Sequence, residues 1–96
     1  MGKILIKIHE SGVVSLCDAN LLGKSFEEGD FCLDVSEHFF KGEERTEEYI
    51  AGMLQSAGNA AIVGKDSVDL AVKHGIISKD CVRKVGKVPF AYLFAV

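Results

Sequence analysis

The sequence contains no stretch of about 18 apolar residues, which is the length that a helix needs to cross a lipid bilayer. Its first apolar run is interrupted by Lys7 before it becomes long enough to act as the core of a signal peptide. These absences argue against a membrane-spanning helix and a secretory leader. We therefore expect a cytoplasmic protein with no membrane partner.

Cysteine is scarce, and its spacing is uninformative for disulfides and for zinc. Cys17, Cys32 and Cys81 are an odd number at wide spacing and form no Cys-x-x-Cys pair, so neither a disulfide framework nor a zinc site of neighbouring ligands is indicated. We expect three free thiols. Internal repeats and linkers are also absent. With 96 residues, 48% of them hydrophobic, the chain can build one core, and we expect a single domain over residues 1–96.

Apolar and polar residues alternate in several short segments, as in strands with one buried side. In the first segment Ile4, Ile6 and Ile8 share one side, and a short turn joins this segment to the next as a hairpin. The predicted strands are residues 3–10, 13–18, 31–35, 81–85 and 88–96. Residues 18–30 are expected to be a connection and residues 36–42 a turn. The last strand is apolar on both sides, so we expect it inside the sheet.

Two segments have the apolar period of an α-helix. One follows Thr46, its predicted N-cap, and stops near Gly58. The other follows a short apolar run at residues 60–63, which is predicted to be a strand or extended segment. Asp66 is the predicted N-cap of this helix, and Gly75 is at the left-handed position that ends a helix. The patterns together predict a single α+β domain, in which a mixed, mainly antiparallel sheet of about five strands packs with two principal helices.

Charge is distributed unevenly along the chain. Residues 1–59 contain five Lys or Arg against eleven Asp or Glu, whereas residues 60–96 contain six against three. The candidate anion-binding or RNA-binding residues are in this second part: Lys65, Ser67, Lys73, Arg83, Lys84 and Lys87. Lysines would neutralise phosphates, and the helix start at residues 64–67 would offer N–H groups to an anion. The alternatives are ordinary helix capping and a solvated rim of charges.

A second candidate site depends on how the first three strands are arranged. If they are neighbours, His9, Cys17, Cys32 and Asp34 share the side of the sheet opposite the isoleucines. Imidazole, thiolate and carboxylate are common metal ligands, and a cysteine beside a histidine can be an activated nucleophile. A second buried side, covered by the helices, explains the same pattern.

Several segments resemble a known family when they are taken in order: residues 6–10, 21–24, 26–30, 59–77, and Val88-Pro89 near the end. Together they resemble an archaeal family of small uncharacterised proteins, domain-of-unknown-function family 424. The resemblance implies an archaeal, cytoplasmic α+β domain and carries over no catalytic residue. A link to translation or RNA is an expectation from the kind of family this is.

The leading hypothesis is a non-enzymatic binding module that acts with RNA, a ribonucleoprotein or a translation-related protein. The charge asymmetry and the family resemblance motivate it, and it predicts no cofactor. The alternative is a small enzyme or metal-binding protein that uses the His9, Cys17, Cys32 and Asp34 side. A third hypothesis is a structural subunit of a homodimer.

Overall fold

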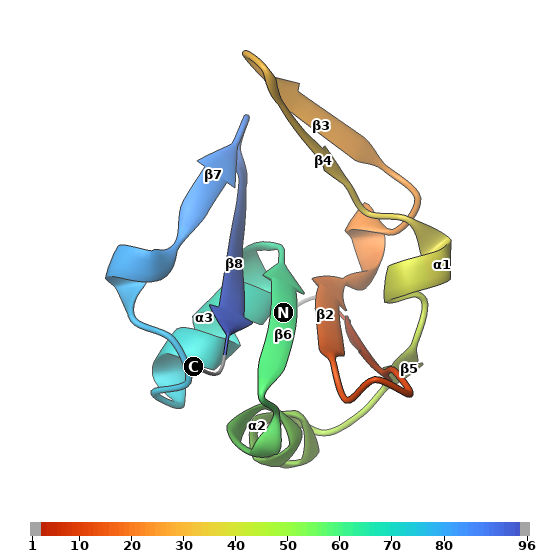
Figure 1. Ribbon diagram of the computed structural model, residues 1–96, viewed down its shortest axis with the longest axis vertical. Helices are drawn as coiled ribbons and strands as arrows, with labels where there is room; N and C mark the ends of the chain where they lie inside the picture. The colour runs from red at the N-terminus through yellow and green to blue at the C-terminus, as the bar shows by residue number, and fades with distance from the viewer. Residues whose placement is uncertain (1–2, 95–96) are drawn as a thin grey trace.

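A mixed six-stranded β-sheet forms the centre of the computed structural model, which describes residues 3–94 (Figure 1). The strands are β1 (Ile4–Ile8), β2 (Val14–Asp18), β5 (Glu43–Glu44), β6 (Asn59–Val63), β7 (Arg83–Val85) and β8 (Val88–Phe94). Their order across the sheet is β5-β1-β2-β6-β8-β7. Strands β2 and β6 pair in parallel, and the other neighbours pair antiparallel. The predicted α+β class with a mixed, mainly antiparallel sheet is confirmed.

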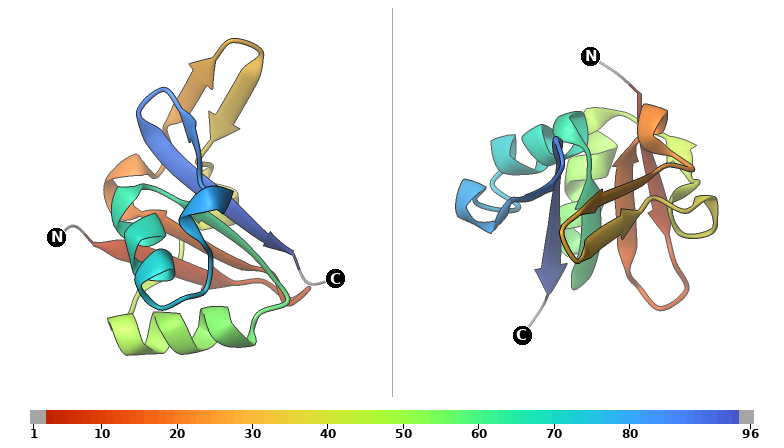
Figure 2. Two further views of the ribbon diagram at one scale, coloured as in Figure 1. Left: turned by 90° about the vertical axis from the view of Figure 1, so that its left-hand side faces the viewer. Right: turned by 90° about the horizontal axis from the view of Figure 1, so that it is seen from above.

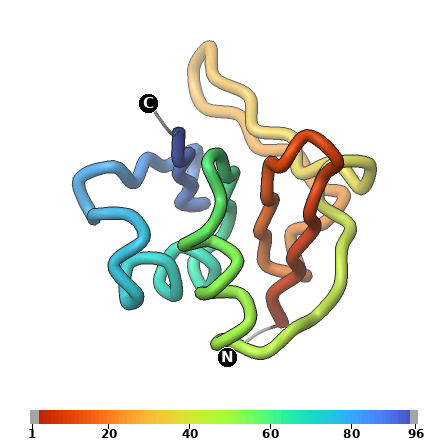
Figure 3. The backbone as a smooth tube through the Cα atoms, turned by 60° about the horizontal axis from the view of Figure 1, so that its bottom comes forward, coloured from red at the N-terminus to blue at the C-terminus, as the bar shows by residue number. Residues whose placement is uncertain are grey.

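A separate hairpin and three α-helices complete the fold. The hairpin consists of β3 (Ser25–Glu28) and β4 (Phe31–Asp34), and it projects from the body of the molecule (Figure 3). The α-helices are α1 (Glu37–Phe40), α2 (Glu47–Ser56) and α3 (Lys65–Lys73), and two short 3-10 turns are η1 (Ala19–Leu21) and η2 (Lys79–Cys81).

The first three predicted strands are not neighbours in one sheet, so the arrangement on which the second candidate site depends is not met. Strand β4 pairs with β3 rather than with β1 or β2, and β3 lies in the segment expected to be a connection. Three of its four residues are exposed, so β3 has no alternation strong enough to detect. The short α1 and the two-residue β5 were also missed, because each is too brief to show a period. The interior place of β8, between β6 and β7, is confirmed as far as Phe94, and the predicted residues 95–96 lie outside the described chain.

One face of the sheet packs against α2 and α3. Ile6 and Leu16 of the first hairpin meet Ile62 of β6, and Ile50 from α2 and Val68 from α3 cover them. All five side chains are buried. Each fully buried aliphatic side chain stabilises the fold by about 1.5–3 kcal/mol, so this cluster is the main core.

The opposite face packs against the β3–β4 hairpin and α1 (Figure 2). Cys17, Val63 and Phe90 from the sheet contact Leu33 of β4 and Phe40 of α1. The expected second buried side therefore exists. Its cover is the hairpin and α1, not the helices that the sequence suggested. We call the two sides the helix face and the hairpin face.

Asp18, the last residue of β2, fixes the start of α3. Its Oδ2 accepts the backbone N–H of Asp66 at 3.1 Å, and its Oδ1 accepts the N–H of Ser67 at 2.9 Å and the Ser67 hydroxyl at 2.7 Å. Gly64 is the N-cap residue, with φ of 108° and no capping side chain. The prediction of Asp66 as the N-cap is therefore wrong: the capping carboxylate comes from the neighbouring parallel strand.

The other predicted caps agree with the structure. The Thr46 hydroxyl oxygen accepts the N–H of Tyr49 at 3.2 Å at the start of α2. That helix ends at Ser56, two residues before the glycine proposed as its stop. Gly75, after α3, has the predicted positive φ, 71°.

Candidate functional site

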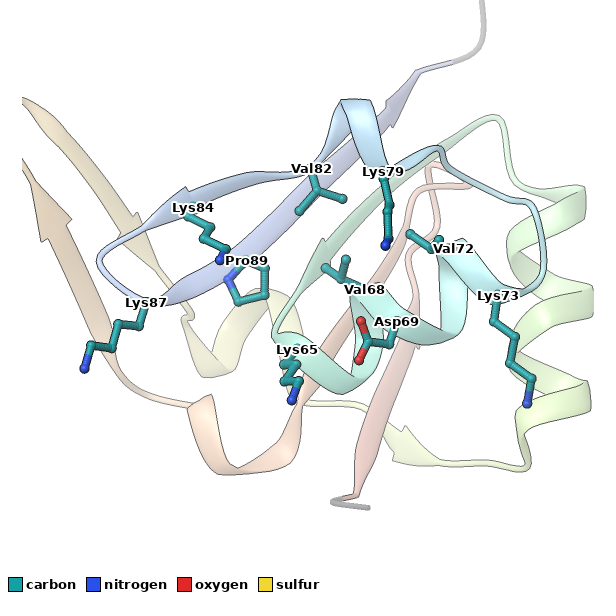
Figure 4. A pocket seen from close by; sticks show the side chains of 10 residues that line it. All are labelled: Lys65, Val68, Asp69, Val72, Lys73, Lys79, Val82, Lys84, Lys87 and Pro89. Carbon is teal, nitrogen blue, oxygen red and sulfur yellow. The ribbon is translucent and has the colours of Figure 1, made fainter.

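A groove of about 770 Å³ lies between α3 and the β7–β8 hairpin (Figure 4). Its floor is aliphatic and most of its rim is cationic, so we call it the basic groove. The residues that line it are Lys65, Val68, Asp69, Val72, Lys73, Lys79, Val82, Lys84, Lys87 and Pro89. Five lysines thus surround a cavity to which Asp69 contributes a carboxylate.

The spacing of residues along the helix and the alternation along the strand determine which side chains face the groove. Lys65, Val68 and Val72 follow the three- and four-residue spacing of one side of α3. On β7, alternation turns Lys84 toward the groove, whereas Val85 is buried in the cluster on the hairpin face. Pro89 of β8 closes the floor. The groove is therefore a direct consequence of one helix packing beside one hairpin.

The cations on the rim differ in what they contact. Lys73 Nζ lies 3.0 Å from Glu47 Oε2, so Lys73 is already paired with a carboxylate of α2. Within residues 3–94 no ion pair involves Lys65, Lys79, Lys84 or Lys87. These four come from the start of α3, from η2, from β7 and from the β7–β8 turn (Figure 4). They can therefore give a positive potential to a single ligand that spans the groove.

Four of the six residues selected from the sequence meet in this groove, and two do not. Lys65, Lys73, Lys84 and Lys87 line it. Ser67 is fully buried and donates both its N–H and its hydroxyl to Asp18, so neither donor remains for an external anion. The Arg83 guanidinium donates to the carbonyl of Asp80 at 3.3 Å.

Sequence reasoning missed the aliphatic floor, and it counted Lys79 among the basic residues of the second part of the chain without selecting it as a site candidate. Val68 and Val72 were identified only as the apolar side of a helix, and Val82 as part of a strand. The available signal was a side of α3 that combines valines with Lys65. Recognising a groove there required knowing that β7 and β8 turn back beside α3.

The alternative residues, His9, Cys17, Cys32 and Asp34, do not form a ligand cluster. Within residues 3–94, no group of three or more His, Cys, Asp or Glu side chains has a geometry that could hold a metal ion. Cys32 and Asp34 are exposed on the projecting hairpin, and Asp34 accepts a hydrogen bond from Ser25 at 3.1 Å. Cys17 is buried under Phe40.

The contacts of His9 and Cys17 are those of residues with a structural role. His9 Nε2 lies 3.1 Å from the carbonyl oxygen of Phe39 and 3.2 Å from the hydroxyl of Ser15, and its ring stacks on Phe39. Burial, with a smaller contribution from the neighbouring Asp18, raises the pKa of the Cys17 thiol from 9.0 to about 11. An activated nucleophile needs the opposite shift, so Cys17 does not have the properties of a reactive cysteine.

The fold and the groove define a class: a small α+β domain with a lysine-rimmed surface groove. More specifically, the chain belongs to the family described as Protein of unknown function (DUF424), which matches residues 6–96. The resemblance seen in the sequence is thereby confirmed.

No curated protein matches the chain. No helix within residues 3–94 has the length and apolarity required to cross a membrane.

A solved structure has the same fold. It is an uncharacterized conserved protein from the archaeon Methanopyrus kandleri, and it is similar to this chain with a TM-score of 0.76 and 26% sequence identity. The similarity covers 99% of this chain and 95% of that chain. The architecture described above is therefore shared over nearly the whole of both compared chains.

Proposed function

We propose that this protein is a non-enzymatic binding module of the cytoplasm that binds RNA through the basic groove. The observation that carries the proposal is the convergence of five lysines on one groove with a single aspartate, in a chain whose net charge is −3. A ribonucleoprotein would be engaged through its RNA in the same way.

The chemistry of the rim suits a phosphate backbone. Lysine is a flexible point charge, able to neutralise phosphates without fixed geometry. The four lysines without ion pairs in residues 3–94 lie on separate elements, so they can follow successive phosphates of one strand. Association should weaken steeply with salt, because each neutralised phosphate of a single strand releases counterions and contributes about −0.7 to the slope of log K against log salt.

The chemistry of the floor limits what can be recognised. Val68, Val72, Val82 and Pro89 offer no aromatic ring on which a base could stack, and stacking is a main source of base contacts in single-stranded RNA binding. We therefore expect binding with little sequence preference.

The direct test measures binding of a labelled oligouridylate at several salt concentrations. The double variant Lys84→Gln/Lys87→Gln should bind more weakly, and its salt slope should be shallower by roughly 1.4, the sum for two lost phosphate contacts. Lys41→Gln is the matched control, because Lys41 is exposed and lines a different pocket. Absence of salt-dependent binding, or equal loss in the control, would contradict the proposal.

Asp69 gives a test of opposite sign. Its carboxylate faces the same groove as the lysines, so it should repel phosphates. Asp69→Asn should therefore strengthen oligouridylate binding by a few-fold. Weaker or unchanged binding would show that the RNA lies elsewhere.

A further inference from the structure

A second groove, of about 670 Å³, lies on the hairpin face, and the proposed RNA site makes no use of it. Tyr92 and Phe94 at the end of β8 form one wall, and Cys32 and Leu33 of β4 contribute to the other. Ala61 of β6 lies between these walls, and its small side chain leaves the space open. We call this cavity the aromatic groove.

Three aromatic rings on this face are exposed. Phe94 is 70% exposed, and Tyr92 and Phe31 are each 46% exposed. Together with the buried Phe90 they form a row of rings. The ring centroids are 5.3 Å apart between Phe31 and Phe90, 5.7 Å between Phe90 and Tyr92, and 6.1 Å between Tyr92 and Phe94. Exposed rings that line a groove, as Tyr92 and Phe94 do, are typical of protein interaction sites, where aromatic residues supply much of the affinity.

Charge identifies the kind of partner. Among residues 3–94, the lining of the aromatic groove includes the carboxylate of Asp34 and no lysine or arginine. The hairpin beside it, residues 25–34, carries Glu27, Glu28, Asp30 and Asp34 and no basic residue. Of these, Glu28 already accepts the N–H of Gly86 at 2.8 Å. Arg83 is held by the carbonyl of Asp80 and does not line the groove.

The same charges argue against two other occupants. RNA phosphates would meet carboxylates with no cation in the groove to neutralise them. A second copy docked through the same patch would place one acidic hairpin beside another, because a two-fold interface joins identical surfaces. A cationic, apolar protein segment has neither difficulty.

We propose that the aromatic groove docks a segment of a partner protein in which apolar side chains alternate with lysine or arginine. The apolar side chains fill the space between Phe94 and Leu33, and the basic ones meet the carboxylates of the hairpin. The protein would then have two separate docking surfaces of opposite character, one on each face of its sheet.

Native thiols make the proposal testable without a label. Cys32 lines the aromatic groove, whereas Cys81 is exposed on η2, outside its lining. A synthetic peptide of alternating leucine and lysine should slow alkylation of Cys32 by iodoacetamide several-fold and leave Cys81 unchanged, as read by peptide mass mapping. A matched leucine–glutamate peptide should protect neither thiol.

Two variants link the protection to the groove. Phe94→Ser should abolish it, and because Phe94 is largely exposed the fold should survive. Tyr49→Ser is the control, since Tyr49 is also an exposed aromatic residue but lies beside another pocket. Asp34→Lys should weaken protection by the lysine peptide.

Several results would overturn the proposal. These are no protection of Cys32 by the lysine peptide, equal protection by the glutamate peptide, and protection of Cys32 by oligouridylate. Another is a dimer in sedimentation that Phe94→Ser dissociates, which would make the occupant a second copy. None of these results depends on whether RNA binds the basic groove.

Discussion

The basic groove and the aromatic groove share strand β8 but have opposite chemistry. Pro89 lines the basic groove, whereas Tyr92 and Phe94, on the other side of the strand, line the aromatic groove. Five lysines border the first, and neither lysine nor arginine borders the second. The alternation of a single strand therefore gives two faces that can serve different partners without sharing a side chain.

The two grooves also differ in how firmly their walls are held. The wall that α3 provides is fixed by three hydrogen bonds from Asp66 and Ser67 to Asp18, and it belongs to the main core. The hairpin wall projects from the body, and its contacts with the rest include Phe31 on Phe90 and Glu28 on Gly86. Six of the eight residues of β3 and β4 are exposed, which is typical of regions that open locally, so we expect the basic groove to be the more rigid one.

The largest expected effect comes from breaking the support of α3 with Gly64→Ala. Gly64 has φ 108° and ψ 155°, a conformation that is almost exclusive to glycine, and an added Cβ would lie 2.6 Å from both carboxylate oxygens of Asp18. Strain and clash together should lower the free energy of unfolding by roughly 3 kcal/mol or more, measured by urea denaturation.

Gly52→Ala is the matched control for that change. Gly52 lies within α2, is exposed, and would have no atom within 4 Å of an added Cβ. Alanine is the better helix former, so this substitution should raise stability by about 1 kcal/mol. Equal effects of the two substitutions would contradict the role given to Gly64.

The next effect concerns the reactivity of the three cysteine thiols. Cys17 has a pKa of about 11, against an ordinary 9.0, so its thiolate fraction at mildly alkaline pH is reduced about a hundredfold. Cys32 and Cys81 should react quickly with a disulfide reagent, and Cys17 should react at least about a hundredfold more slowly until the protein is unfolded. A fast third thiol in the native protein would revive the enzyme alternative.

A smaller effect distinguishes the two faces at adjacent residues of β7. Lys84 lines the basic groove, whereas its neighbour Arg83 does not. Lys84→Gln should weaken oligouridylate binding by roughly two- to fivefold, and Arg83→Gln should leave it nearly unchanged. Equal losses would mean that net charge, not the groove, determines binding.

The smallest effect is the pH dependence of the contact between α2 and α3. Hydrogen bonds from His74 and Lys73 hold the pKa of Glu47 below its ordinary value of 4.5. A lowered pKa in the folded state stabilises the protein above pH 4.5, and that stabilisation disappears as the pH falls through the folded-state value. Glu47→Gln should therefore lower the urea midpoint at pH 7 and have little effect in strong acid. A deficit that persists at low pH would contradict this assignment.

The sequence predicted those parts of the fold that have a long enough period. The alternation of the first hairpin, the helix after Thr46 and the strand predicted at residues 88–96 were sufficient to predict the α+β class. Brief elements such as β5 escaped, because two residues cannot show a pattern. The parallel pairing of β2 with β6 could not be predicted either, since it joins residues far apart in the sequence, such as Val14 and Ala60.

The candidate site was predictable in composition but not in shape. The basic half of the sequence pointed to Lys65, Lys84 and Lys87, which the structure brings together. The capping of α3 by Asp18 depends on the parallel pair of strands, and it removed Ser67 from the set. The sequence showed that the last strand is rich in aromatic residues. Which of its rings are exposed depends on where the hairpin stops covering the sheet.

The central claim is that RNA and a protein segment would meet different faces of one sheet. The most direct measurement is an amide chemical-shift titration of the whole protein with a short oligouridylate. We expect shifts at the basic groove, around Val68, Val82 and Lys84, with the signals of Leu33 and Tyr92 unmoved. Shifts centred on the aromatic groove, or no shifts at low salt, would contradict the claim.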